Sequence, residues 1–131
     1  MNILMFLFAL IVIAMVGYGI YLLVLWIMRK QSAVMVDSQE IRENMRRNQV
    51  VDVRETSEFN ANHILGARNI PMSQFKQRFQ EIRKDQAVYL YDDALNYASR
   101  AANILKKEGY DKIYILDGGF SKWTGKVKSE L

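Results

Sequence analysis

The 131-residue chain has no cysteine, a single proline and no charged side chain before Arg29. Without cysteine it cannot form a disulfide, a Cys-ligated zinc or iron–sulfur site, or a thiol nucleophile of its own. One proline and seven glycines are too few for a disordered or collagen-like chain, and no internal repeat is present. The composition therefore indicates an ordinary folded chain whose chemistry cannot depend on its own sulfur.

Charge is distributed unevenly along the chain. All 18 Lys and Arg and all 14 Asp and Glu lie from Arg29 onward, in the last 103 residues. That length suits one small domain, which buries about 60–70% of the surface exposed by its unfolded chain. We therefore expect a transmembrane helix over residues 1–28, a juxtamembrane tether over 29–36 and one domain over 37–131.

The uncharged segment, residues 3–28, is long enough to cross a bilayer. As a helix it would measure about 39 Å, against about 30 Å for the hydrocarbon core. Tyr18, Tyr21 and Trp26 lie toward its C-terminal end, where aromatic side chains settle at a membrane interface, and Arg29 and Lys30 follow. This pattern predicts a single-pass protein of the cell membrane, with the N-terminus outside and the C-terminal domain cytoplasmic.

The sequence disfavours two alternatives to a membrane anchor. A cleavable signal peptide would have a basic start, a shorter apolar run and a small-x-small cleavage site, none of which is seen here. A buried core helix would need a larger partner to cover a segment that is apolar all round. With the predicted orientation, basic residues could hold the domain against an anionic leaflet; these are Arg29, Lys30, Arg42, Arg46 and Arg47.

The remaining sequence alternates between helical and strand patterns. Asp37 and Glu40 have capping-box spacing, which predicts a helix from Ser38 to about Arg47. Strands are expected at 50–53, 69–70, 87–91 and 112–116, and helices at 55–60, at 75–82 with Ser73 as the cap, and at 99–108 with Gly109 as the stop. This alternation predicts an α/β domain with a mainly parallel sheet and helices on both faces. Ligands bind such folds at the carboxyl ends of the strands, in the loops that begin at Arg54, Asp92 and Asp117.

A specific family pattern occupies residues 50–71, VVDVRETSEFNANHILGARNIP. It resembles the first signature of the rhodanese-like domain, D-x-R-x-x-x-E-[FY]-x-x-x-H-I-x-G-A-x-N-I-P. A second segment, GYDKIYILDGGFSKW, resembles the closing motif of the family. The resemblance implies a rhodanese-like fold and a set of structural motif residues: Asp52, Arg54, Glu58, Phe59, His63, Ile64, Gly66, Ala67, Asn69, Ile70, Pro71, Gly118, Gly119 and Trp123.

The loop that would carry the chemistry departs from the family pattern. Members that transfer sulfur read C-x-x-G-x-R-S-x-x-A-A-x-x-L, whereas this chain reads DDALNYASRAANIL. Asp92 stands where the resemblance implies the cysteine, Leu95 where it implies glycine, and Tyr97 where it implies arginine. The degenerate active-site loop consists of Asp92, Asp93, Ala94, Leu95, Asn96 and Tyr97.

The substitution at position 92 removes the expected chemistry. Sulfur transfer needs a polarizable thiolate, and a carboxylate cannot hold a persulfide. Two arrangements of Asp92 remain open: its carboxylate accepts amide hydrogen bonds of the loop, filling the anion cradle, or it faces solvent. An aspartyl-phosphate on Asp92 with Asp93 as metal ligand is a weaker alternative, because no phosphate-binding motif accompanies it.

The other conspicuous polar residues favour structural interpretations. His63 is the only histidine, so the sequence predicts no metal site and no cofactor, and we expect His63 to order its loop. Asp52 and Arg54 are expected to form an internal ion pair or hydrogen bonds to the loop backbone, in preference to binding a substrate. Gly118 and Gly119 permit a tight turn but lack the spacing of a nucleotide cradle.

These observations favour a catalytically inactive rhodanese-like domain, a pseudoenzyme and sulfurtransferase homologue, tethered to the membrane as a binding or scaffolding module. The alternatives are sulfurtransferase-related activity dependent on a partner thiol, or an Asp92-dependent hydrolase. The net charge of +4 is carried by mixed acids and bases without a nucleic-acid recognition motif. The expected partners are therefore the lipid bilayer and an unknown protein, and not nucleic acid.

Overall fold

The computed structural model describes residues 2–30, 33–94 and 96–131. The degenerate-loop residue Leu95 lies outside the described residues. The chain divides into two compact units, residues 1–31 and residues 32–131.

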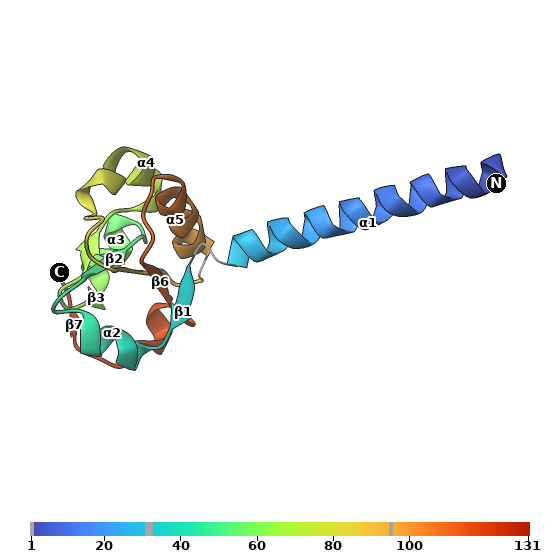
Figure 1. Ribbon diagram of the computed structural model, residues 1–131. Helices are drawn as coiled ribbons and strands as arrows, with labels where there is room; N and C mark the ends of the chain where they lie inside the picture. Colours follow the sequence, from blue (N-terminus) through green and yellow to red (C-terminus); the bar gives the residue numbers. More distant parts are fainter. Residues whose placement is uncertain (1, 31–32, 95) are drawn as a thin grey trace. The chain divides into compact units, whose positions relative to one another are not determined.

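The first unit is a single helix, α1 (Ile3–Lys30), drawn in blue in Figure 1. It contains a segment, Ile3–Ile27, that is long and apolar enough to span a membrane, and none of that segment is buried within the structure. Its large apolar side chains are exposed. The structure thus contains one N-terminal helix of the length and composition that the sequence predicts for a membrane span.

The second unit is built on a five-stranded parallel sheet. Its strands lie in the order β1-β6-β5-β2-β4 and every neighbouring pair is parallel. The strands are β1 (Val34–Val36), β2 (Gln49–Asp52), β4 (Arg68–Asn69), β5 (Val88–Tyr91) and β6 (Ile113–Leu116). This confirms the predicted α/β class with a parallel central sheet.

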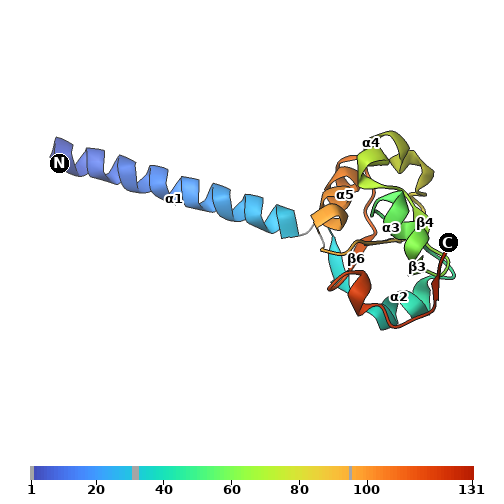
Figure 2. The same ribbon diagram turned by 180° about the vertical axis from the view of Figure 1, so that it is seen from behind.

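Helices cover both faces of this sheet. These are α2 (Ser38–Asn44), α3 (Thr56–Ala61), α4 (Phe75–Arg78) and α5 (Asn96–Lys107). Figures 1 and 2 show α4 and α5 on one side of the sheet and α2 on the other. The strand sequence explains this division, because alternate side chains point to opposite faces. In β5, Val88 and Leu90 join the core under α4 and α5, whereas Tyr89 and Tyr91 join the core beneath α2.

A short antiparallel pair, β3 (His63–Ile64) with β7 (Val127–Lys128), ties the end of the chain to the domain. Sequence analysis missed both strands, because two-residue strands have no measurable periodicity. The backbone N–H of Glu130 donates to the carbonyl of Asn60 at 2.8 Å and extends this attachment. The C-terminal residues are therefore attached to the domain through backbone hydrogen bonds, while their side chains stay exposed.

The chain between the two units differs from the expected tether over residues 29–36. Helix α1 continues through Lys30, and Val34–Val36 form the edge strand β1 against β6. The apolar run Val34, Met35, Val36 is too short to distinguish a strand from a linker by periodicity alone. Contact with β6 therefore decides its conformation.

Helix α2 begins as predicted but ends early. Asp37 caps it by accepting the backbone N–H of Glu40 at 2.9 Å. It ends at Asn44 instead of Arg47, because the chain must turn to place Gln49 against Ala87, where the N–H of Gln49 donates to the carbonyl of Ala87 at 3.1 Å.

The expected helix over 75–82 is reduced to four residues between two 3₁₀ turns, Met72–Gln74 and Phe79–Glu81. The predicted cap by Ser73 is wrong. Its hydroxyl donates to the Glu55 carboxylate at 3.1 Å instead. A tertiary contact between distant residues here replaces a local cap.

Candidate functional site at the carboxyl end of the sheet

Two of the three predicted loops form one pocket. Strands β2 and β5 are adjacent and parallel, with Asp52 paired to Tyr91, so the segments that follow them lie side by side. They enclose a cavity of about 260 Å³. It is lined by Arg54, Glu58, Asp92, Asp93, Ala94, Asn96 and Tyr97.

The third predicted loop borders a different cavity. Asp117 lines a depression of about 460 Å³ together with Asp37, Arg42 and Lys122. The same loop still supports the first pocket through its backbone, because the N–H of Phe120 donates to the carbonyl of Asp92 at 2.8 Å.

Gly119 permits this approach. Its φ is +76°, and a Cβ at this position would lie 2.6 Å from the carbonyl oxygen of Asp92 and 2.7 Å from that of Asp93. Any side chain would therefore push the degenerate loop outward. The double glycine is a close-packing feature, as the sequence indicated.

Asp92 is buried at the start of α5. The residue is 3% exposed, and its Oδ2 accepts the backbone N–H of Tyr97 at 2.8 Å. The alternative in which Asp92 faces solvent is therefore wrong. Its carboxylate accepts a hydrogen bond from a backbone N–H of the loop. This hydrogen bond also explains why α5 begins at Asn96 and not at the expected Ser99, because it satisfies an N–H of the first turn.

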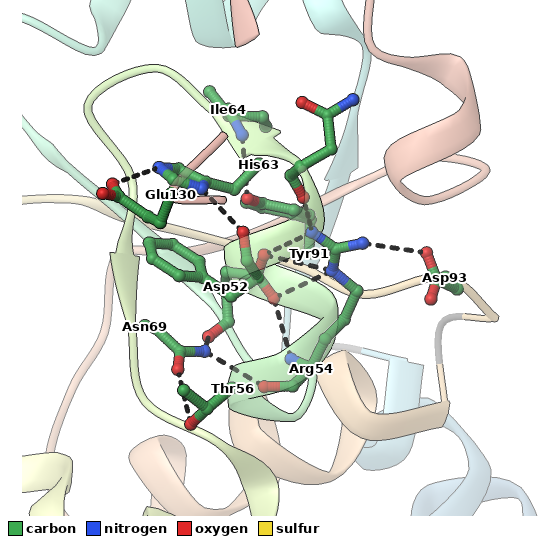
Figure 3. Close-up of polar contacts among 11 residues, drawn as sticks. Asp52, Arg54, Thr56, His63, Ile64, Asn69, Tyr91, Asp93 and Glu130 are labelled. Carbon is green, nitrogen blue, oxygen red and sulfur yellow. Dashed lines mark hydrogen bonds and ion pairs between the residues drawn. The ribbon is translucent and has the colours of Figure 1, made fainter. Parts of the chain in front are cut away.

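Asp52 and Arg54 form the ion pair expected from the sequence (Figure 3). The Arg54 Nη2 lies 2.8 Å from Oδ2 of Asp52, and the Nε donates to the same carboxylate. Arg54 Nη2 also donates to the carbonyl of Asn62, and Nη1 lies 3.5 Å from Asp93. Asp52 is fully buried and Arg54 is 5% exposed, so the pair is internal to the fold.

Tyr91 supports the site through contacts that sequence analysis did not predict. Its hydroxyl accepts the backbone N–H of Ile64 at 3.1 Å, and its ring stacks on Phe120 with centroids 5.7 Å apart. Burial, assisted by the negative charge of Asp52, raises the pKa of the Tyr91 hydroxyl well above its usual range. The guanidinium of Arg54 lies 4.5 Å from the Phe120 ring centroid. The sequence feature that could have indicated this role is the position of Tyr91, the last residue of a buried strand directly before the degenerate loop.

Two carboxyl groups meet at the pocket. A hydrogen bond with Asp93 raises the pKa of Glu58 above its usual range, with smaller contributions from partial burial and from the Asp93 charge. The Asp93 side chain is 57% exposed and also faces Arg54. The pocket therefore places Arg54, already paired with Asp52, beside three further acidic side chains.

His63 orders its loop, as expected. Its Nδ1 lies 2.8 Å from the carbonyl of Phe59 and donates to it, and the two rings stack with centroids 3.7 Å apart. Its Nε2 lies 3.8 Å from Glu130 on the C-terminal segment (Figure 3). Gly66, with φ of +92°, turns the chain after β3. Among the described residues, no group of three or more His, Asp or Glu could hold a metal ion.

The closing motif packs beneath α2. Trp123 contacts the core that contains Ile41 and Tyr91, and its Nε1 donates to the carbonyl of Lys126 at 3.0 Å. Trp123 therefore has a packing role and lies outside the pocket lining.

The chain is similar in sequence and fold to known proteins. The chain is 43% identical over 120 residues to the uncharacterized protein YqhL of Bacillus subtilis, covering 92% of this chain and 95% of that protein. It is 36% identical over 74 residues to the thiosulfate sulfurtransferase GlpE of Tolumonas auensis, covering 56% of this chain and 70% of that protein.

Among solved structures, a thiosulfate sulfurtransferase from Pseudomonas aeruginosa matches with a TM-score of 0.68 and 31% identity. The match covers 75% of this chain and 20% of that one. The family model of the rhodanese-like domain matches residues 37–126. The chain belongs to the rhodanese-like domain family.

Proposed function

We propose that this protein is a membrane-tethered rhodanese-like domain that has lost sulfur transfer and acts as a binding or scaffolding module. The observation that carries the proposal is the state of position 92. A carboxylate is buried there, 3% exposed and hydrogen-bonded to the first turn of α5, in a chain with no cysteine.

The site chemistry supports the loss of activity. A persulfide intermediate requires a sulfur nucleophile, which this chain lacks. The acidic groups around the pocket, Glu58, Asp92 and Asp93, also oppose an anionic donor such as thiosulfate. A hydrolase that uses Asp92 as nucleophile is less well supported, because its carboxylate is buried and bound to a backbone amide.

Membrane attachment is the second part of the proposal. Helix α1 has the length and composition of a membrane span. The bias of basic residues toward its C-terminal side supports a cytoplasmic position for the domain and an outside position for the N-terminus. Protease protection of the domain in intact cells tests this orientation, and digestion of the domain by external protease would contradict it.

A sulfur-transfer assay tests the loss of activity. We expect the full chain in detergent to transfer no sulfur from thiosulfate to cyanide above the blank. The matched variant is Asp92→Cys, which places a thiol at this position. Its thiolate is expected to attack the outer sulfur of thiosulfate, form a persulfide and release sulfite, and mass spectrometry detects the one added sulfur atom. Turnover by the wild type that Asp92→Ala abolishes would contradict the proposal.

In-cell crosslinking tests the binding role. A photo-crosslinking side chain at position 97, where Tyr97 is 39% exposed and lines the pocket, is expected to capture one specific protein. The same group at position 76, on α4 and outside this pocket, is the control. Identical capture profiles from the two positions would contradict a partner at the degenerate loop.

A further inference from the structure

The two ends of the parallel sheet carry opposite charge. Because all five strands run the same way, their amino ends lie along one edge, which we call the amino edge. Three segments gather there: residues 45–48 after α2, residues 83–87 before β5, and residues 106–112, which comprise the end of α5 and the loop before β6. Hydrogen bonds join these segments. Asn48 Oδ1 accepts the backbone N–H of Ala87 at 3.0 Å, and the backbone N–H of Val88 donates to the carbonyl of Lys112 at 3.0 Å.

These segments are strongly basic. Their charged side chains are all exposed, and one ion pair is present among them in the described structure, Arg83 with Asp85 at 2.6 Å. The bases are Arg46, Arg47, Arg83, Lys84, Lys106, Lys107 and Lys112, against Asp85, Glu108 and Asp111.

The loops at the carboxyl ends of the strands have the opposite balance. They carry Asp37, Glu55, Glu58, Asp92, Asp93 and Asp117 against Arg42, Arg54 and Lys122. The structure thereby separates three arginines that the sequence grouped together. Arg46 and Arg47 belong to the amino edge, whereas Arg42 lines the depression beside Asp37 and Asp117.

The chain enters the domain at the amino edge. Ala33 is three residues beyond Lys30, the last residue of α1, so at most about 11 Å of extended chain separates them. Strand β1 follows at once, hydrogen-bonded on one side to β6, and its Val34 and Met35 are 57% and 45% exposed. A short apolar strand thus adjoins the basic segments and begins four residues along the chain from the last residue of α1.

We propose that the amino edge, together with Val34 and Met35, binds the anionic surface of the bilayer that α1 enters. Clustered Lys and Arg bind anionic lipid, and a covalent anchor keeps the surface within reach. Nucleic acid is the less favoured anion, because the ring of Tyr110 at this edge is buried, lies 5.4 Å from Lys84 Nζ and offers no exposed face for a base. With the amino edge on lipid, the degenerate pocket at the opposite end of the strands faces away from the membrane.

Lipid-to-protein fluorescence quenching tests the surface. The chain has no native cysteine, so Glu108→Cys and Ser121→Cys each place one fluorophore, at the amino edge and at the carboxyl end respectively. The full chain is reconstituted in vesicles of phosphatidylcholine, with or without phosphatidylserine, that contain a headgroup-attached quencher. We expect strong quenching at position 108 only with phosphatidylserine, loss of that quenching in high salt, and little quenching at position 121 in either vesicle.

Charge variants assign the effect to these residues. Lys106→Gln, Lys107→Gln and Lys112→Gln are each expected to lower the ratio of bound to free domain about fivefold, the factor that corresponds to about 1 kcal/mol. Lys76→Gln and Lys122→Gln, outside the amino edge, are the matched controls and should leave quenching unchanged. Circular dichroism checks that every variant is folded.

Three outcomes overturn the proposal. These are equal quenching at positions 108 and 121, quenching that ignores lipid charge, and a response at position 108 to added RNA but not to phosphatidylserine. The inference depends on insertion of α1, which belongs to the proposed function. Flotation of each variant with the vesicles measures insertion separately, so that failure to insert is distinguished from failure of the surface to bind.

Discussion

The carboxyl and amino ends of the sheet use charge in different ways. At the carboxyl end, three charged side chains are buried and bonded to the fold: Asp52 and Asp92 are 0% and 3% exposed, and Arg54 is enclosed by Asp52, Asn62 and Phe120. At the amino end, seven basic side chains are exposed and only Arg83 forms an ion pair with an acid of that end in the described structure.

This difference indicates that charged residues at the carboxyl end maintain the structure of the degenerate site, whereas those at the amino end form an exposed basic surface. The polar groups of the carboxyl end satisfy one another, and no buried side-chain polar atom of the described residues lacks a hydrogen bond. Substitutions there should therefore change folding first. Substitutions at the amino end should change association with other molecules and leave the fold intact.

The largest expected effect is that of Arg54→Ala. Removing the guanidinium leaves Asp52 charged, fully buried and without its bidentate partner, which typically costs about 3–5 kcal/mol of the free energy of unfolding. The amino-end counterpart is Arg83→Ala, whose ion pair with Asp85 is exposed and screened by solvent, so its removal is expected to change the free energy of unfolding little.

Urea unfolding of the full chain in detergent measures both changes. A Trp26→Phe background lets the fluorescence of Trp123 report the domain alone. Similar unfolding midpoints for the two arginine variants would show that the carboxyl-end pair is no more structural than the amino-end pair.

The next largest effect is expected for Gly119→Ala. Both Gly119 and Gly109 have positive φ, so alanine is strained at either position, by about 1 kcal/mol. At Gly119 the new methyl group would also lie 2.6 Å from the backbone oxygen of Asp92, whereas at Gly109 it would meet the flexible tip of Lys84 at 3.4 Å.

Gly119→Ala should therefore lower the melting temperature by at least twice as much as Gly109→Ala. It should also displace the loop at Asp92, visible as changed amide chemical shifts around Tyr97. Equal melting temperatures for the two alanine variants would mean that the degenerate loop moves aside at little cost.

The rhodanese-like signature allowed the fold and the Asp52–Arg54 pair to be predicted, because its residues serve packing and local hydrogen bonding. Val50, Val51 and Val53 lie in the core, and the Asp52–Arg54 contact spans two residues of sequence. Patterns of this kind are local and can be read from a single chain.

What sequence analysis missed depends on contacts between distant segments. The Tyr91 hydroxyl meets the backbone of Ile64, 27 positions away, and Ser73 is drawn to Glu55 in place of capping α4. Strand β1 exists because β6 lies beside it. Burial of Asp92, left open by the sequence, follows from the support that the Phe120 amide gives to its carbonyl.

The smallest expected effect concerns acids at the two ends, whose pKa values shift in opposite directions. The pKa of Glu58 is raised above 4.5 by its hydrogen bond to Asp93, whereas the hydrogen bond from Arg83 lowers the pKa of Asp85 below 3.8. The Glu58 pair therefore stabilises the fold below pH 4.5 and loses this contribution as the pH rises through the raised pKa. Asp85 contributes above pH 3.8 and loses its contribution as the pH falls through the lowered pKa.

Carboxyl NMR of the full chain between pH 3 and 7 measures both titrations. Asp93→Asn removes the like charge and supplies an amide donor, so the pKa of Glu58 should fall toward its ordinary value while that of Asp85 stays unchanged. Arg83→Gln should raise the pKa of Asp85 alone. If Glu58 titrates identically with and without Asp93, the carboxyl pair is absent in solution, and Arg54 rather than a shared proton controls the charge of the pocket.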